Sequence, residues 1–218
     1  MEDTTIEDVL KTVQNYYTQK DYQSALDTLI KNQDQVPPGI WHYNAGTLYG
    51  KLENWAMARF HFLSADSEGY TSKESVLNRQ LVEEKLNIEK IEKPTSASDY
   101  FYKFSMIGTQ GIFTTLGLIL IIAGIVAIWK KANVRVTMVF FLTALMTLGL
   151  NWWILSLDKS IVLTSVQIHE GPSAIFASAD ELPKGVLIIT SRKEGWLEIK
   201  YPSRFMGWIK DSGLKELK

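Results

Sequence analysis

The middle of the chain carries two long apolar stretches, whereas charged residues are spread over the two ends. No charged side chain occurs in residues 107–129 or in residues 136–157. At about 1.5 Å of rise per residue, a helix over either stretch can cross a hydrocarbon core about 30 Å thick. The pattern therefore predicts a transmembrane hairpin over residues 105–157, with spans at about 107–129 and 136–157.

Aromatic residues stand at the ends of both apolar stretches. Trp129 closes the first, and Trp152 and Trp153 close the second. Four more aromatic residues precede the first stretch, namely Tyr100, Phe101, Tyr102 and Phe104. Amphipathic rings prefer the headgroup level of a bilayer. Because no Asp, Glu, Lys or Arg lies within either span, we do not expect a proton path or an ion channel.

Small residues recur within the two stretches. Gly117 and Gly124 lie in the first, and Thr143 and Thr147 stand one turn apart in the second. Small side chains let membrane helices approach closely. Two interpretations stay open: a face for self-association, or a seam that packs the two helices of the hairpin on each other, and we favour the seam.

Two spans return the chain to its starting side, so both flanking domains share one compartment. The tight loop carries Lys130, Lys131 and Arg135, whereas the outer flanks offer one nearby cation each, Lys103 and Lys159. Basic loops stay in the cytoplasm, so we expect both domains on the periplasmic side. The acidic N-terminus lacks the features of a signal peptide. This leaves three alternatives: a start further upstream, translocation by the hairpin, or cytoplasmic domains.

Small and apolar residues repeat ahead of the hairpin. Tyr16, Ala25 and Leu29 recur 33 positions later as aromatic or small residues. The second copy fits the tetratricopeptide spacing, with Gly46, Tyr49, Ala58, Phe62 and Ala65 at the expected positions. The first copy departs from it at Val13 and Asn32. We predict an all-α tetratricopeptide-like repeat domain over residues 1–93, joined to the membrane by a linker at 94–104.

Helix signals divide this predicted repeat domain. Thr4 with Glu7 has the spacing of a capping box for the first helix. A single fifth helix is expected over residues 72–93, with Leu77, Leu81 and Ile88 on its apolar face. Such a helix, polar on its other side, covers the exposed end of a repeat stack.

A repeat stack of this kind offers a concave groove for a peptide or a partner helix. If the tetratricopeptide geometry holds, Tyr43, Asn44, Thr47 and Lys51 face that groove, and we take them as candidate partner-binding residues. The alternative interpretation is that Tyr43 is partly packed and that Lys51 is a solvated charge. Two repeats make a shallow groove.

Beyond the hairpin, short β-rich runs alternate with Gly- and Pro-containing turns, which is typical of a small sheet. We predict a small all-β barrel over residues 161–218. It resembles the bacterial SH3-like domain at Gly171, Pro172, Ser173, Gly185, Trp196, Gly207 and Trp208. We interpret Gly207 and Trp208 as structural. Tyr201, Phe205 and the turn at 169–173 are the candidates for an exposed binding face.

Charge and composition narrow the chemistry. A net charge of −1 argues against nucleic acid as a partner, because binding phosphates requires a basic face. The chain has no cysteine, and its histidines are His42, His61 and His169. The first two fall within one repeat, but no carboxylate or cysteine accompanies them at a metal-ligand spacing, so each histidine is interpreted as a polar surface residue. With no phosphate loop, GxSxG or HExxH motif, we expect no enzyme, no cofactor and no metal site.

The multidomain order of helical repeat, two spans and SH3-like domain resembles the BatE-like proteins of the Bacteroides aerotolerance (Bat) operon family. The segment YNAGTLYGKLENWAMARFHFLSA, followed by a charged helix ending in KIEKP, carries much of this resemblance. The resemblance implies a bacterial inner-membrane scaffold or adaptor for a complex related to aerotolerance or envelope stress. Its implied partners are other membrane proteins, namely Bat proteins with von Willebrand factor A domains, and indirectly a MoxR-type ATPase.

A rival hypothesis places the function in the C-terminal domain. SH3-like domains of bacteria bind peptides or cell-wall fragments. In this second interpretation the protein is a membrane tether that binds peptidoglycan, or an envelope sensor.

Overall fold

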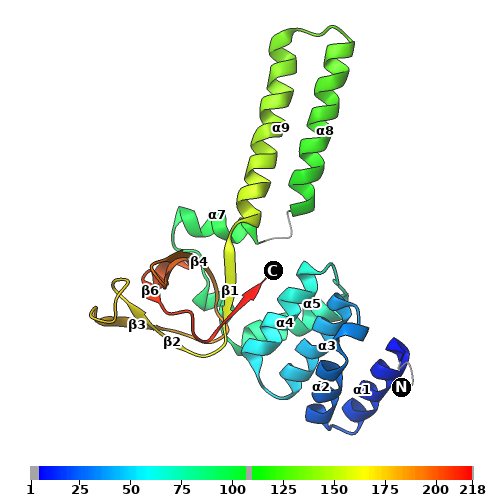
Figure 1. Ribbon diagram of the computed structural model, residues 1–218, viewed down its shortest axis with the longest axis vertical. Coiled ribbons are helices and arrows are strands. Elements are labelled where there is room, and N and C mark those ends of the chain that lie inside the picture. The colour runs from blue at the N-terminus through cyan, green and yellow to red at the C-terminus, as the bar shows by residue number, and fades with distance from the viewer. Residues whose placement is uncertain (1–4, 107–109, 218) are drawn as a thin grey trace. The chain divides into compact units, whose positions relative to one another are not determined.

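The computed structural model describes residues 5–106 and 110–217 (Figure 1). It divides into two compact units. One combines Met1–Asp99 with Asp158–Lys218, and the other is Tyr100–Leu157. The helical N-terminal part and the C-terminal sheet therefore belong to one unit, although the apolar hairpin separates them in the sequence.

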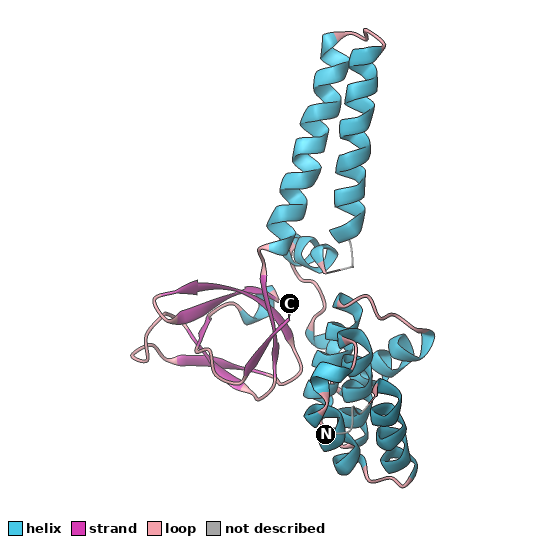
Figure 2. Cartoon of the chain, turned by 45° about the vertical axis from the view of Figure 1, so that its right-hand side comes forward, coloured by secondary structure: helices cyan, strands magenta, loops and turns pink. Residues whose placement is uncertain are grey.

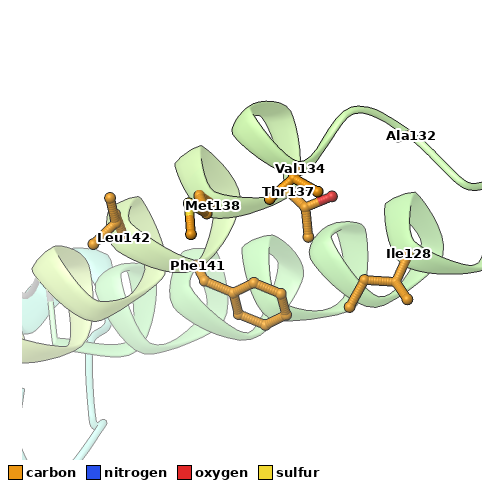
Figure 3. Close-up of a pocket in the computed structure, with 7 residues that line it drawn as sticks. All are labelled: Ile128, Ala132, Val134, Thr137, Met138, Phe141 and Leu142. Carbon is orange, nitrogen blue, oxygen red and sulfur yellow. The ribbon is translucent and has the colours of Figure 1, made fainter.

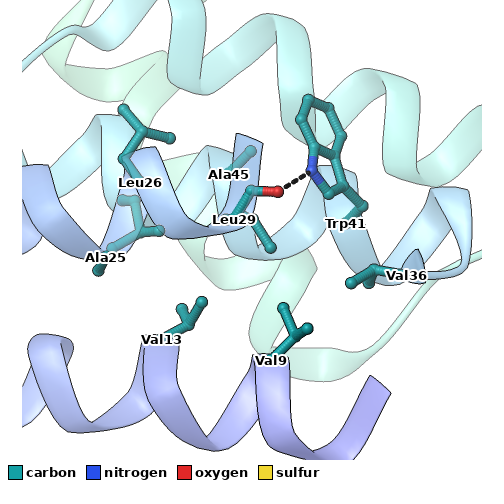
Figure 4. Packing of buried hydrophobic residues seen from close by; sticks show 9 residues of the cluster. Val9, Val13, Ala25, Leu26, Leu29, Val36, Trp41 and Ala45 are labelled. Carbon is teal, nitrogen blue, oxygen red and sulfur yellow. Dashed lines mark hydrogen bonds between the residues drawn. The ribbon is translucent and has the colours of Figure 1, made fainter. Parts of the chain in front are cut away.

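The N-terminal part consists of helices that pack in consecutive pairs. They are α1 (Ile6–Thr18), α2 (Tyr22–Lys31), the 3₁₀ turn Gln33–Gln35, α3 (Pro38–Lys51), α4 (Trp55–Ser67), α5 (Lys73–Lys85) and α6 (Ile88–Ile91). A core of buried aliphatic side chains joins α1, α2 and α3 (Figure 4). Within it, the indole Nε1 of Trp41 donates a hydrogen bond of 3.0 Å to the carbonyl oxygen of Leu29.

The positions that repeat in the sequence lie where helices cross. Ala25, Leu29, Ala58 and Phe62 are all buried. A Cβ atom placed on Gly46 would lie 3.0 Å from the ring of Phe62, so the absence of a side chain there lets α3 approach α4 closely. Small residues at these positions therefore set the spacing of the helices.

The structure corrects two predicted helix ends. The capping box is formed by Thr5 and Asp8, one residue later than predicted, and Thr4 lies outside the described residues. The predicted fifth helix is interrupted, because Asn87 adopts a left-handed conformation between α5 and α6. Ser72 caps α5 by accepting a hydrogen bond from the amide of Ser75.

The C-terminal part is an antiparallel, open sheet of seven strands in the order β3-β2-β6-β5-β4-β1-β7 (Figure 2). The strands are β1 (Asp158–Val162), β2 (Val166–His169), β3 (Ser178–Leu182), β4 (Leu187–Lys193), β5 (Trp196–Tyr201), β6 (Trp208–Ile209) and β7 (Leu214–Leu217), with a 3₁₀ turn at Ser203–Phe205. Its apolar core includes Val162, Ile168, Ile188 and Ile199. The β region begins at Asp158, three residues before the predicted start, because the polar residues ahead of Ile161 already pair with β4.

The second unit contains the two helices α8 (Gln110–Trp129) and α9 (Val134–Leu155). Both are long and apolar enough to cross a membrane. Residues 107–109 of the first predicted span lie outside the described residues. The second helix begins two residues before the predicted start. Residues of the predicted linker 94–104 form most of a further helix, α7 (Ala97–Ser105), which is rich in aromatic residues.

Two of the three glycines of α8, Gly117 and Gly124, lie against α9, whereas a Cβ atom on Gly111 would meet no atom within 4 Å. A Cβ atom on Gly117 would lie 2.8 Å from the side chain of Leu148, and one on Gly124 would lie 2.9 Å from the ring of Phe141. These contacts favour the seam between the two helices over a face for self-association. Near the tight end of the hairpin, an apolar recess of about 530 Å³ is lined by Ile128, Ala132, Val134, Thr137, Met138, Phe141 and Leu142 (Figure 3). No charged side chain lines it, which fits contact with hydrocarbon.

Candidate functional site

The four candidate groove residues all lie on α3. Lys51 is exposed, and Tyr43, Asn44 and Thr47 are half-buried. The hydroxyl of Thr47 donates to the carbonyl oxygen of Tyr43 over 3.0 Å, and the side-chain amide of Asn44 donates to the carbonyl oxygen of Ile40 over 2.9 Å. Thr47 and Asn44 thus bond to their own helix, which leaves the ring of Tyr43 and the ammonium group of Lys51 as the groups available to a partner.

Neighbouring elements extend this surface on both sides of α3. The ammonium group of Lys51 lies 5.8 Å from the centre of the Tyr17 ring, on α1. The rings of Tyr43 and Tyr70, which stands just before α5, are 5.1 Å apart. Side chains of α1, of α3 and of the segment before α5 therefore lie next to one another in pairs, with Lys51 beside Tyr17 and Tyr43 beside Tyr70.

Two leucines of α5 belong to the same surface, and their exposure corrects the sequence prediction. Leu77 and Leu81, expected on a packed face, are 54% and 52% exposed, whereas Val82 is buried. Val82 stands 34 positions after Leu48, which is buried on α3. By the same offset, Leu77 corresponds to Tyr43 and Leu81 to Thr47. We call Tyr17, Tyr43, Thr47, Lys51, Leu77 and Leu81 the repeat face.

Electrostatics keep the Tyr43 hydroxyl neutral. Burial raises its pKa above the ordinary value, and the nearby Tyr70 and Glu74 raise it further. A neutral hydroxyl can either donate or accept a hydrogen bond. The repeat face therefore combines apolar contact area with the hydroxyls of Tyr17 and Tyr43 and the cation of Lys51, which are groups that hold an amphipathic helix or an extended peptide.

The candidates in the sheet are not exposed, so the prediction of a binding face at Tyr201 and Phe205 is wrong. Tyr201 is 1% and Phe205 is 5% exposed. Phe205 packs into the core of the sheet. The hydroxyl of Tyr201 donates to the carbonyl oxygen of Glu92 over 3.3 Å, and burial together with the Glu92 carboxylate raises its pKa. Both rings hold the fold together.

The exposed apolar side chains of the sheet lie in its loops instead. Ile175 is almost fully exposed, and Phe176 and Met206 are largely exposed. The predicted turn at 169–173 begins this loop, and the ring nitrogen Nδ1 of His169 lies 3.2 Å from the carbonyl oxygen of Phe176. The loop thus presents two apolar side chains that the sequence interpretation did not single out.

His42 and His61 do approach each other, with 2.9 Å between their Nδ1 atoms. His61 is buried, so its interpretation as a surface residue is wrong; its ring stacks on that of Tyr49. Burial, together with the neighbouring His42 and Lys215, lowers the pKa of His61 to about 3. One neutral ring must donate and the other accept. Within the described residues, no group of three or more His, Cys, Asp or Glu side chains comes together to bind a metal.

A buried ion pair joins the helical part to the sheet. The two terminal guanidinium nitrogens of Arg59 on α4 donate to the carboxylate of Glu92, at 2.5 and 2.9 Å, and its Nε donates to Glu83 over 3.3 Å. Arg59 also donates to the carbonyl oxygen of Gly185, and the amide of Leu187 donates to Glu92 over 2.7 Å. Burial alone would lower the pKa of Arg59, but the carboxylates of Glu92 and Glu83 together outweigh it and the pKa is raised. We call Arg59, Glu92, Gly185 and Leu187 the junction.

Comparisons of the chain with protein-family models, with curated proteins and with solved structures found no match.

Proposed function

We propose that this protein is a non-catalytic membrane scaffold that holds partner proteins on the repeat face. The apolar hairpin fixes the chain in a membrane, and the helical part and the sheet present binding surfaces on one side of it. In this proposal the helical part is a tetratricopeptide-like repeat domain, the sheet is an SH3-like domain, and the membrane is a bacterial inner membrane with both domains in the periplasm.

The exposure of Leu77 and Leu81 is the observation that carries the proposal. A helix in water buries its apolar face, and α5 does so with Val82 while leaving two leucines outside. By the 34-residue offset, these leucines stand on α5 at the positions that Tyr43 and Thr47 hold on α3. Contiguous exposed apolar side chains with a polar rim are typical of a surface that binds another protein.

The junction supports the scaffold role because it fixes the helices that carry the repeat face to the sheet. Arg59 lies on α4, next to the helix that carries Tyr43, and it bonds to the backbone of Gly185 in the sheet. A bidentate pair between buried groups fixes both direction and distance. A partner bound to the repeat face is therefore held at a defined place relative to the sheet.

The partners we propose follow from the resemblance to the Bat family. They are membrane proteins with von Willebrand factor A domains, acting with a MoxR-type ATPase. The chain would then be the assembly factor of a complex related to aerotolerance or envelope stress.

The test is recovery of partners in mild detergent. We expect the full chain to retain membrane proteins with von Willebrand factor A domains, and the double variant Leu77→Glu/Leu81→Glu to lose at least about tenfold of that recovery, because two buried carboxylates oppose an apolar interface. Ile30→Glu is the matched control, since Ile30 is an exposed aliphatic residue of α2 outside the repeat face. Equal recovery by all three proteins would refute the proposal.

A second candidate function is binding of peptidoglycan by the sheet. The exposed side chains of Ile175, Phe176 and Met206 favour it, because sugar rings bind to exposed apolar and aromatic side chains. The full chain in detergent should then sediment with purified sacculi, and Phe176→Ala should release it. Failure of the wild-type chain to sediment would remove this candidate and leave the first one untouched.

A further inference from the structure

The helix α7 has its apolar side facing outwards. Ala97, Tyr100, Phe101 and Phe104 are all exposed, the three aromatic residues by 66%, 47% and 46%, and they stand at the spacing i, i+3, i+4, i+7 that places them on one side of a helix. A helix that packs on a soluble protein turns its apolar side inwards. The orientation of α7 is the reverse of that pattern.

The polar side of α7 is the side that the protein holds. Asp99 is buried, and its carboxylate accepts hydrogen bonds from the backbone amides of Thr95 and Ser203, each over 2.9 Å. The hydroxyls of the same two residues donate to the same carboxylate. These bonds hold Asp99 in the first turn of α7, on the side of the helix opposite Ala97.

The aromatic residues of α7 are continuous with the apolar hairpin. The rings of Phe101 and Trp153, at the end of α9, are 5.0 Å apart, and those of Tyr102 and Trp153 are 6.0 Å apart. Phe104 lies 6.1 Å from Phe113 in the first turns of α8. Only residues 106–109 separate α7 from α8, so the end of α7 lies within about 18 Å of the start of that helix.

We propose that α7 is an interfacial helix that lies in the lipid headgroup layer, with Tyr100, Phe101 and Phe104 inserted among the upper acyl carbons. This inference rests on the proposed membrane anchor. Tyr and Phe next to a membrane span prefer the boundary between headgroups and hydrocarbon, and an amphipathic helix lies along that boundary with its apolar side down. Lys103 stands on the edge of the helix, where its ammonium group reaches the lipid phosphates.

The chain has no cysteine, so one introduced cysteine carries one fluorescent reporter. The full chain is reconstituted in vesicles of phosphatidylcholine and phosphatidylglycerol. Reporters at Ala97→Cys and Phe104→Cys test the apolar side, and Ala97→Cys retains all three aromatic rings. Ser98→Cys is the matched control, because it is exposed on the same helix outside the apolar side. Leu118→Cys, exposed on α8, reports on the anchor itself.

We expect nitroxide groups near the lipid headgroups to quench the reporters at Ala97 and Phe104 about threefold more than the reporter at Ser98, with the opposite order for aqueous iodide. Iodide quenching at Phe104 equal to that at Ser98 would overturn the inference, and would point to a protein partner for this side of the helix. Nitroxide groups deep in the bilayer should quench the Leu118 reporter. Loss of that signal would refute the membrane anchor, whereas its presence without quenching at Phe104 would refute the interfacial helix alone.

Discussion

Arg59 and Glu92 form a buried bidentate pair across 33 residues of sequence, and both also bond to the backbone of the sheet. Two charges removed from water are stable only when each finds its partner and its remaining hydrogen bonds are made. Here Gly185 and Leu187 make those bonds, so folding of the helical part and docking of the sheet depend on each other.

Arg59→Met is expected to destabilise the unit formed by the helical part and the sheet by about 3–5 kcal/mol, because it leaves the Glu92 carboxylate buried without its cation. Thermal unfolding of the full chain in detergent measures this loss. The control is Arg192→Met, which breaks an exposed pair with Asp211 that is expected to contribute about 0–1 kcal/mol. Equal effects of the two substitutions would show that the junction carries no special stability.

His61 makes stability depend on pH. Burial holds its pKa at about 3 in the folded protein, below the ordinary value of 6.5. The unfolded chain therefore binds a proton at His61 at a higher pH than the folded chain does. The contribution of His61 to the free energy of unfolding is complete above pH 6.5, and it falls by about 1.4 kcal/mol per pH unit as the pH decreases towards 3.

The matched variant is His61→Phe, which keeps a ring against Tyr49 and removes the titration. Denaturant unfolding between pH 7 and pH 4 should give a shallower decline for this variant than for the wild type. Parallel declines would assign the acid sensitivity to carboxylates instead.

The repeat face and the core should respond differently to truncation. Leu29 of α2 is buried in the core that α2 shares with α1 and α3. Leu29→Ala should therefore lower the free energy of unfolding by about 2–5 kcal/mol, through lost contacts and a cavity. Leu77→Ala should change the free energy of unfolding by no more than about 0.5 kcal/mol, because the side chain is already exposed to solvent. A large loss from Leu77→Ala would mean that the leucine is packed and is not available to a partner.

Gly207 stands where a side chain does not fit. Its φ is +156°, and a Cβ atom would press on the side chain of Ile168 and lie 2.9 Å from the carbonyl oxygen of His169. Gly207→Ala should cost about 1–3 kcal/mol. Gly195→Ala serves as control, since its Cβ would meet no atom within 4 Å and the cost reduces to that of a positive φ, about 1 kcal/mol. Thermal unfolding of both variants separates the two contributions.

Topology is testable with reporters that are active in one compartment only. Fusions at the two ends of the chain should give the same signal, because two spans return the chain to one side. A phosphatase active in the periplasm and a fluorescent protein active in the cytoplasm decide which side it is. Opposite signals from the two ends would contradict the hairpin.

Strong periodic patterns predicted the elements well. The two apolar helices follow from uninterrupted runs, and the burial of Ala58 and Phe62 follows from their spacing. The strand β5 also held a usable signal: Leu197, Ile199 and Tyr201 alternate, and that alternation places Tyr201 inside. The prediction of an exposed binding face at Tyr201 did not take this alternation into account.

Other features depend on partners that are distant in the sequence. On α5, Leu77 and Leu81 define one possible apolar face and Val82 defines another, and only the position of α4 decides between them. Arg59 resembles any surface cation until Glu92 and Gly185 are placed beside it. The side of α7 that is exposed also depends on such partners. Its aromatic residues predict a position at a membrane interface, but they do not predict which way the helix turns them.

The positions of Gly117 and Gly124 on α8 bear on how one copy of the hairpin could associate with another. Gly117 and Gly124 face the companion helix, so the outer surface of the hairpin is left to branched aliphatic and methionine side chains such as Ile119, Ile122 and Met146. Such side chains are well solvated by acyl chains, and Gly149 on α9 is an exposed position where a neighbouring backbone would meet no side chain of its own. Gly117 and Gly124 are thus used up inside one hairpin and are not available to a second copy of the chain.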